Sequence, residues 1–121
     1  VEMARQICAE YGCKKVASVV RNISCVERSI WMGMLFDAES GEHWFSPAHD
    51  VHVLEGVAAG DAFNAGLVHA LINDFDPQAA VNYAIAASIL KLTIKGDSNL
   101  VTADEIAAAA SAADGGTRVA R

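Results

Sequence analysis

The apolar residues of this 121-residue chain change their spacing near the middle of the sequence. Before residue 55, short runs rich in β-branched and aromatic residues are separated by turn residues, which predicts strands. A short helix is expected over residues 2–11, with Gly12 as its stop. The expected strands are Val16–Val20, Ile30–Phe36, His43–Phe45 and Val51–Leu54, of which the second and third flank a polar turn and form a hairpin.

From Gly60 onward the pattern is helical, because Phe63, Leu67, Ala70 and Leu71 fall on one face. Asp76 and Pro77 form a cap and first-turn pair that opens a second helix, running to about Thr93. This helix is apolar on nearly every side, so it is either buried or lines a pocket with one face. A capping box at Thr102 and Glu105 starts a third helix, from Ala103 to about Ala113.

Between the last expected strand and the first long helix lies a loop of small residues that ends in one acid, Gly56-Val-Ala-Ala-Gly-Asp61. A phosphoryl group can approach the backbone of such a loop closely, and the positive end of the helix attracts it. Asp61 cannot hold a phosphate itself, so its expected work is to bind a metal or to take a proton from an acceptor hydroxyl. The alternative is an ordinary strand-to-helix connection with a capping acid. The loop has neither the P-loop nor the dinucleotide-binding pattern.

Composition limits the classes of function. At 53% hydrophobic residues, the chain can bury one modest core, so residues 1–121 are expected to be a single unit with a mobile tail over 114–121. A net charge of −6 argues against nucleic acid or an anionic membrane as partner. The chain begins at Val1 and reads as a piece of something longer, with a cytoplasmic location as the default.

No metal-ligand spacing is evident. Cys8, Cys13 and Cys25 are expected to be reduced thiols, mostly buried. His49 and His52 lie three residues apart in an extended segment, where side chains alternate between faces, so they do not form a metal site together. His69 is expected to be exposed. Trp31 and Trp44 are expected to pack across the hairpin, with stacking on a nucleotide base as the less common alternative.

The run from Gly56 to Gly66, the alanine-rich helix after it and the segment Lys95-Gly-Asp-Ser-Asn-Leu-Val-Thr102 together resemble the second signature of the ribokinase-like (phosphofructokinase-B type) sugar kinases. Within that family, residues 11–121 are most similar to 2-dehydro-3-deoxygluconate kinases, notably in the stretch from Ala86 through Lys91 to Asp97. The resemblance implies an α/β protein of ribokinase-like three-layer fold, of which this chain is the C-terminal part, with few strands and three main helices. It also implies ATP and Mg²⁺ as cofactors.

The resemblance implies roles for particular residues. Ala58, Ala59 and Gly60 would form the anion hole through their backbone N–H groups, and Asp61 would be the catalytic base that also meets the sugar. Asp97 falls where these kinases contact sugar hydroxyls. Ile85 and Ser88 fall where the family's alanine-rich helix borders the nucleotide. The implied function is ATP-dependent phosphorylation of a sugar hydroxyl, most simply that of 2-dehydro-3-deoxy-D-gluconate, with homo-oligomers possible and the 121 residues alone inactive.

Two positions depart from the family pattern. Ala58 stands where the family has the first glycine of the anion hole, and Glu55 replaces the usual aspartate. If φ at position 58 is positive, the Cβ costs about 1–2 kcal/mol; if φ is negative, the methyl group crowds the phosphate. A non-catalytic remnant that keeps nucleotide binding or only the fold is therefore the alternative function.

Overall fold

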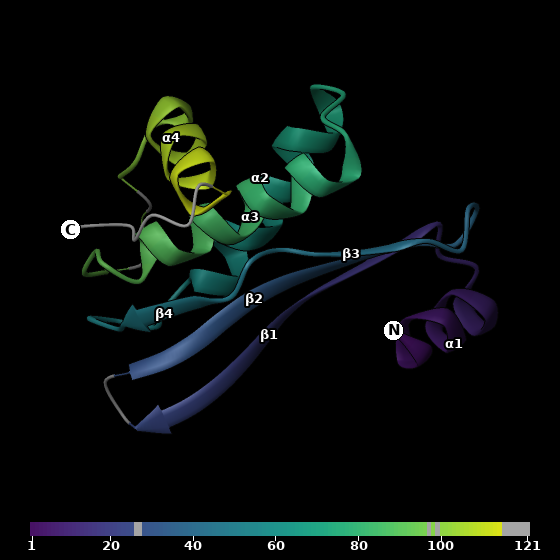
Figure 1. Cartoon of the computed structure of the whole chain (residues 1–121), viewed down its shortest axis with the longest axis horizontal. Helices are drawn as coiled ribbons and strands as arrows, with labels where there is room; N and C mark the ends of the chain where they lie inside the picture. The colour runs from purple at the N-terminus through teal and green to yellow at the C-terminus, as the bar shows by residue number, and fades with distance from the viewer. Residues whose placement is uncertain (26–27, 97, 99, 115–121) are drawn as a thin grey trace.

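A four-stranded antiparallel sheet forms one layer of the molecule (Figure 1), with β2 (Arg28–Asp37) at its centre. This computed structural model describes residues 1–25, 28–96, 98 and 100–114. The long strand β1 (Lys15–Cys25) pairs with one edge of β2. Two short strands, β3 (His43–Phe45) and β4 (His49–His52), follow one another along its other edge. The β2–β3 hairpin predicted from the sequence is confirmed.

Ser46 bridges the gap between β3 and β4. Its backbone N–H donates to the Gly33 carbonyl at 2.9 Å, and its side-chain Oγ accepts from Gly33 N–H at 2.8 Å. The middle of β2 therefore keeps both of its backbone hydrogen bonds where the neighbouring strand is interrupted. The interruption lets the chain turn toward the helices without leaving buried backbone groups unpaired.

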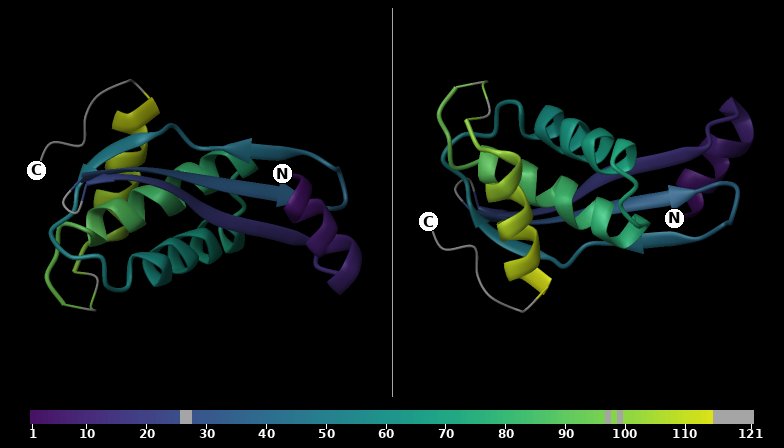
Figure 2. Two further views of the ribbon diagram at one scale, coloured as in Figure 1. Left: turned by 90° about the horizontal axis from the view of Figure 1, so that it is seen from below. Right: turned by 90° about the horizontal axis from the view of Figure 1, so that it is seen from above.

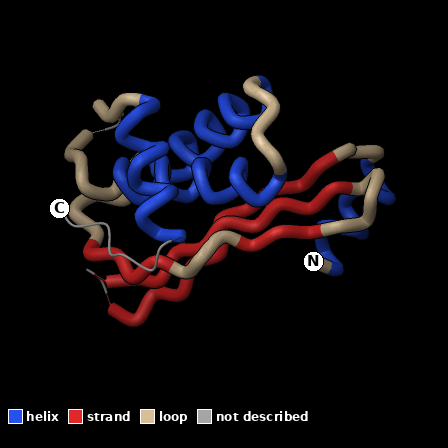
Figure 3. The backbone as a smooth tube through the Cα atoms, turned by 45° about the horizontal axis from the view of Figure 1, so that its top comes forward, coloured by secondary structure: helices blue, strands red, loops and turns tan. Residues whose placement is uncertain are grey.

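Three helices lie on one side of the sheet (Figure 3): α2 (Ala59–Ile72), α3 (Pro77–Lys91) and α4 (Ala103–Asp114). Helix α3 packs on β2 and β3, and α4 packs on α3. Asp76 caps α3 by accepting from Ala79 N–H at 2.9 Å, and the predicted Thr102–Glu105 capping box is present with both of its hydrogen bonds. Every residue from Ala80 to Lys91 is buried, so the prediction of a buried helix is confirmed. Among the described residues, no helix combines the length and apolar character needed to cross a membrane.

The helices α2 and α3 run side by side in opposite directions (Figure 2), so that the start of α2 lies at the same end as the last turn of α3. Glycines allow this close approach. A Cβ built on Gly66 would lie 3.0 Å from the Ala87 Cβ and 3.2 Å from the Ala84 Cα. A Cβ on Gly33 in β2 would lie 3.0 Å from atoms of both Phe63 and Val81. The position of α2 is thus set by contacts that leave no room for a methyl group.

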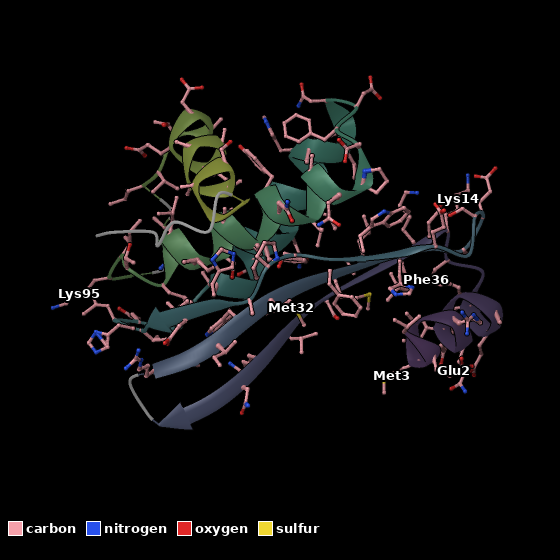
Figure 4. All side chains as sticks on the ribbon, in the orientation of Figure 1. Glu2, Met3, Lys14, Met32, Phe36 and Lys95 are labelled. Atoms are coloured by element: carbon pink, nitrogen blue, oxygen red, sulfur yellow. The ribbon has the colours of Figure 1, made fainter. Side chains whose placement is uncertain are left out.

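The opposite face of the sheet is only partly covered. Helix α1 (Glu2–Tyr11) lies at one end of it, near Phe36 (Figure 4). Ala4 and Cys8 of this helix pack with Met34 and Phe36. Cys8 and Cys13 are free thiols, and Cys25 falls where side chains are not described. Farther along the same strands, Val20 and Ile30 each remain 43% exposed. An apolar surface therefore extends beyond the area that α1 covers.

Several sequence expectations need correction. The strand predicted at Val16–Val20 runs from Lys15 to Cys25, because it pairs with β2 over that whole length. The strand predicted at Val51–Leu54 lies at His49–His52, because β4 pairs with residues 28–31 of β2 and the backbone leaves the sheet after residue 52. Helix α3 ends at Lys91 rather than Thr93, since residues 92–94 form tighter turns that bond three residues back. Trp44 lies opposite Leu35 instead of Trp31, although both tryptophans contact the same apolar core.

We expect Gly66→Ala to lower the free energy of unfolding by about 1–3 kcal/mol, because the added methyl group forces α2 away from α3. Gly60→Ala in the same helix is the matched control. A Cβ there meets nothing within 4 Å, so the better helix propensity of alanine leaves stability unchanged or raises it by up to about 1 kcal/mol. Urea unfolding of both variants measures the difference. Equal effects of the two substitutions would contradict the packing argument.

Candidate active site

The N-terminus of α2, like that of α1, has no side-chain cap. Its N-cap residue is Ala58, which has no side-chain oxygen and forms no capping hydrogen bond. The first helical bond runs from Ala62 N–H to the Ala58 carbonyl at 2.9 Å, so the N–H groups before residue 62 have no partner within the helix. The capped starts of α3 and α4 contrast with this arrangement. An uncapped start leaves several donors and a partial positive charge for an anion.

Ala58 has a left-handed backbone, with φ of 62° and ψ of 12°. The first of the two cases left open by the sequence therefore holds: the residue keeps the conformation for which glycine is favoured, at a cost of about 1–2 kcal/mol. A left-handed residue followed directly by helical residues turns successive N–H groups toward one concave side, as in anion-binding backbone nests. Ala58 therefore has the left-handed backbone that such a nest requires.

Ser88 of α3 fixes the first turn of α2. Its Oγ donates to the Ala59 carbonyl at 2.9 Å, and both residues are buried. Ser88 and Ile85 were expected near the nucleotide, and both side chains are fully buried at the interface of α3 with its neighbours. Their nucleotide contacts stay predictions. What the structure adds is a positional link between α3 and the proposed anion hole.

The loop before Ala58 is attached to the end of α3, at the same end of the helix pair as the start of α2. The N–H groups of Leu54 and Glu55 both donate to the Leu92 carbonyl, at 3.0 and 3.2 Å. The Glu55 carboxylate in turn accepts from Gly96 N–H at 3.0 Å. Glu55 therefore ties this loop to the turn after α3, which gives the replacement of aspartate by glutamate a structural role.

Asp61 lies in the first turn of α2 and is exposed, as is Gly60 beside it. The structure thus brings together the four residues 58–61 that were predicted to act on the phosphoryl group, with the carboxylate next to the free N–H groups. Asp97 lies outside the described residues, so its predicted contact with the sugar stays a prediction. The site can bind an anion through backbone donors and offer a carboxylate at its rim.

A cavity of about 180 Å³ begins one residue after Asp61, between α2, α3 and α4. Its walls are mostly small apolar residues, among them Ala62, Gly66 and Ala87, with His69 and Tyr83 at one side. The exposed His69 ring stacks on Tyr83, with ring centroids 5.3 Å apart. Burial raises the pKa of Tyr83, and the Asp104 carboxylate raises it further, so the phenol stays neutral.

Sequence reasoning from the residues alone missed the polar contacts at the end of α3. Lys91 is buried there and donates to two carbonyl oxygens of the following turn. Leu92 holds the site loop through its backbone, which no side-chain pattern reveals. The signal that was available for Lys91 is a single charged residue at the end of a helix that is otherwise apolar on nearly every side.

Comparisons with known proteins agree with this fold. The sequence profile of the family described as pfkB family carbohydrate kinase matches residues 32–104, which include β4, the site loop, α2 and α3. The crystal structure of 2-dehydro-3-deoxygluconokinase from Thermotoga maritima superposes with a TM-score of 0.86 at 32% identity, covering 91% of this chain and 33% of that one. The α/β arrangement is therefore that of ribokinase-like proteins.

Two further relatives have other descriptions. A PfkB family carbohydrate kinase from Listeria grayi matches with a TM-score of 0.84 and 26% identity over 88% of this chain and 33% of that one. The ATP-dependent ribose-1-phosphate kinase of Halopiger xanaduensis is 37% identical over 62 residues, which are 51% of this chain and 21% of that protein. The chain thus spans a third or less of the length of these relatives.

We expect Ala58→Gly to stabilise the protein by up to about 1 kcal/mol. Removing the Cβ from a left-handed residue stabilises the folded state by about 1–2 kcal/mol. The greater conformational freedom of glycine in the unfolded chain offsets about 0.4–1 kcal/mol of this gain. Ala59→Gly is the control, because residue 59 is buried in the first turn of the helix and should lose at least about 0.5–1 kcal/mol. Thermal or urea unfolding distinguishes them, and a destabilised Ala58→Gly protein would refute the assigned conformation.

Proposed function

We propose, since this chain belongs to the pfkB family of carbohydrate kinases, that a full-length protein containing it transfers the γ-phosphoryl group of ATP to a sugar hydroxyl at the start of α2. One observation carries the proposal. The left-handed Ala58, the uncapped helix start and the exposed carboxylate of Asp61 lie within four consecutive residues. Anion binding and proton acceptance are thereby available at adjacent positions.

In the proposed reaction, the sugar hydroxyl oxygen attacks the γ-phosphorus while the bond from that phosphorus to the β,γ-bridging oxygen breaks. Asp61 accepts the hydroxyl proton, and ADP leaves with the bridging oxygen. The N–H groups of Ala58, Ala59 and Gly60 would donate to the oxygens of the transferring group, where negative charge is spread in the transition state. Because the first turn is held by Ser88, these donors need little reorganisation when the reaction occurs.

Mg²⁺ would enter this site on the nucleotide rather than on a protein cage. Among the described residues no three potential ligand side chains gather in one place, whereas Asp61 and the helix start suit the phosphates of a metal-bound nucleotide. When bound, Mg²⁺ would neutralise part of the negative charge on the phosphate groups. The residues of this chain then need only to orient the phosphoryl group and receive one proton.

The substrate that we propose is 2-dehydro-3-deoxy-D-gluconate, phosphorylated at its terminal hydroxyl. Its support is the likeness of 91% of this chain to an enzyme named for that reaction, at 32% identity. Asp97 is the proposed contact to the sugar hydroxyls. A second candidate is ribose 1-phosphate, since the 37% identical segment belongs to a kinase named for that substrate. We further propose a cytoplasmic location, where ATP is supplied, and a possible homo-oligomer.

A protein that binds nucleotide without catalysis is the alternative. The alanine at position 58 motivates it, because this residue departs from the glycine of the family pattern. Binding of Mg·ATP without sugar-dependent release of ADP would favour this alternative. We expect the 121 residues alone to be inactive, so these experiments use the full-length protein.

Asp61→Asn should lower kcat by at least about 100-fold, since it removes the proton acceptor while keeping the size of the side chain. Nucleotide affinity should stay within about threefold of the parent, because the backbone donors are unchanged. Asp74→Asn is the matched control at the opposite end of α2, where residue 74 has φ of 59° and asparagine is well tolerated. Coupled ADP-release kinetics and nucleotide titration measure both quantities. Turnover of Asp61→Asn within a few-fold of the parent would exclude Asp61 as the base.

A substrate panel tests the proposed sugar. ADP release is measured with ketodeoxygluconate, ribose 1-phosphate, fructose, ribose and adenosine at equal Mg·ATP. We expect kcat/KM for ketodeoxygluconate to exceed that for each other compound by at least about tenfold, as recognition of several substrate hydroxyls by polar groups allows. A preference for ribose 1-phosphate would replace the proposed substrate and leave the reaction class intact.

A further inference from the structure

Lys91 is a charged residue with 0% of its surface exposed, at the last position of α3. Its Nζ donates to the Ile94 carbonyl at 3.0 Å and to the Gly96 carbonyl at 2.6 Å. An ammonium group removed from water is strongly destabilising unless oxygen atoms replace its hydration. The two carbonyl groups serve this purpose, and through them the ammonium holds the turn 94–96 against the end of the helix.

The turn that Lys91 holds is in contact with the loop of the candidate active site. Gly96, whose carbonyl accepts from Lys91, donates its own N–H to the Glu55 carboxylate at 3.0 Å. Leu92, next to Lys91, accepts from the N–H groups of Leu54 and Glu55. Glu55 precedes the left-handed Ala58 by only three residues. A continuous series of hydrogen bonds therefore joins the buried ammonium to the loop that leads into α2.

We infer that Lys91 is a positioning residue for the phosphoryl site: its ammonium fixes the turn 94–96, so that Gly96 holds Glu55 and the loop enters α2 in the conformation seen at Ala58. This inference rests on the proposed function for its catalytic consequence. Lys91 acts through Gly96 and Glu55 and does not itself touch the reacting groups. Nothing in the packing of α3 alone requires a charge at this position, because an apolar side chain of similar length would fill the same space.

The charge of Lys91 also suits its place between two helix ends. The negative end of α3 lies at the end of the molecule where α2 presents its positive end, and the Glu55 carboxylate is close to both. Without the ammonium, the partial negative charges of the carbonyl oxygens in the turn and the charge of this carboxylate would be left unbalanced beside a site for an anion. Lys91 thus offsets that charge while it orders the turn.

The test compares Lys91→Met, Lys91→Ala and the parent in the full-length protein. Lys91→Met keeps the volume of the stem, and Lys91→Ala leaves space that a small cation can enter. We expect both to lower kcat by about 10- to 100-fold, as for small misplacements of reacting groups, with a smaller change in KM for the sugar. The amides of Leu54, Glu55 and Gly96 should exchange with deuterium at least about tenfold faster, since their shared turn is released. Ammonium chloride should restore part of the kcat of Lys91→Ala.

Lys95→Met is the control, because Lys95 belongs to the same turn but points away from the protein (Figure 4). Tetramethylammonium chloride at equal concentration is the control for ionic strength, since this ion is too large and has no N–H donors. The inference would be overturned by unchanged amide exchange in Lys91→Met or by an equal loss of kcat in Lys95→Met. Equal effects of the two salts on the kcat of Lys91→Ala would overturn it as well. If the parent phosphorylates none of the sugars, the proposed function fails, and amide exchange alone decides whether Lys91 orders the loop.

Discussion

Close contact between α2 and α3 is the constraint on which the rest of this structure depends. Gly66 lets the backbones approach until a methyl group no longer fits, and the buried alanines of α3 supply the matching surface. At this spacing the Ser88 hydroxyl reaches the Ala59 carbonyl at 2.9 Å. A longer side chain at the contact would separate the two helices and draw the first turn of α2 away from its only side-chain support among the described hydrogen bonds. The packing of α2 against α3 therefore determines the geometry of the candidate site.

Electrostatics at the shared end of these helices follow from their opposite directions. The N–H groups of α2 and the carbonyl groups of α3 lie near each other, so their partial charges have opposite signs. The protein treats the two ends differently: Lys91 satisfies carbonyl groups just beyond α3, whereas the start of α2 carries no cap. The negative end is thus satisfied from within the chain, whereas the N–H groups at the positive end have no side-chain cap. The left-handed Ala58 and the exposed Asp61, more than the missing cap, set this helix start apart from the uncapped start of α1.

Most of the fold could be predicted from the sequence because its signals are local. The start of α3 is marked by Asp76 and Pro77, and the start of α4 by the capping box of Thr102 and Glu105. The continuous apolar, alanine-rich pattern identified α3 as a buried helix. The limits of β4 could not be predicted, since they are set by pairing with a distant strand. The candidate site was located by its small residues and its acid. The conformation of Ala58 and the hydrogen bonds through Leu92 and Gly96 depend on tertiary contacts, so no local pattern could reveal them.

The sheet face that α1 only partly covers has a consequence for how this chain behaves in solution. Val20 and Ile30 lie on it, and β1 forms an outer edge of the sheet. An apolar face beside an open strand edge is suited to a second protein surface. Association through that face would stabilise the folded chain by mass action. Its melting temperature would then rise with protein concentration. The free energy of unfolding of the chain would thus depend on the protein surface that covers this face.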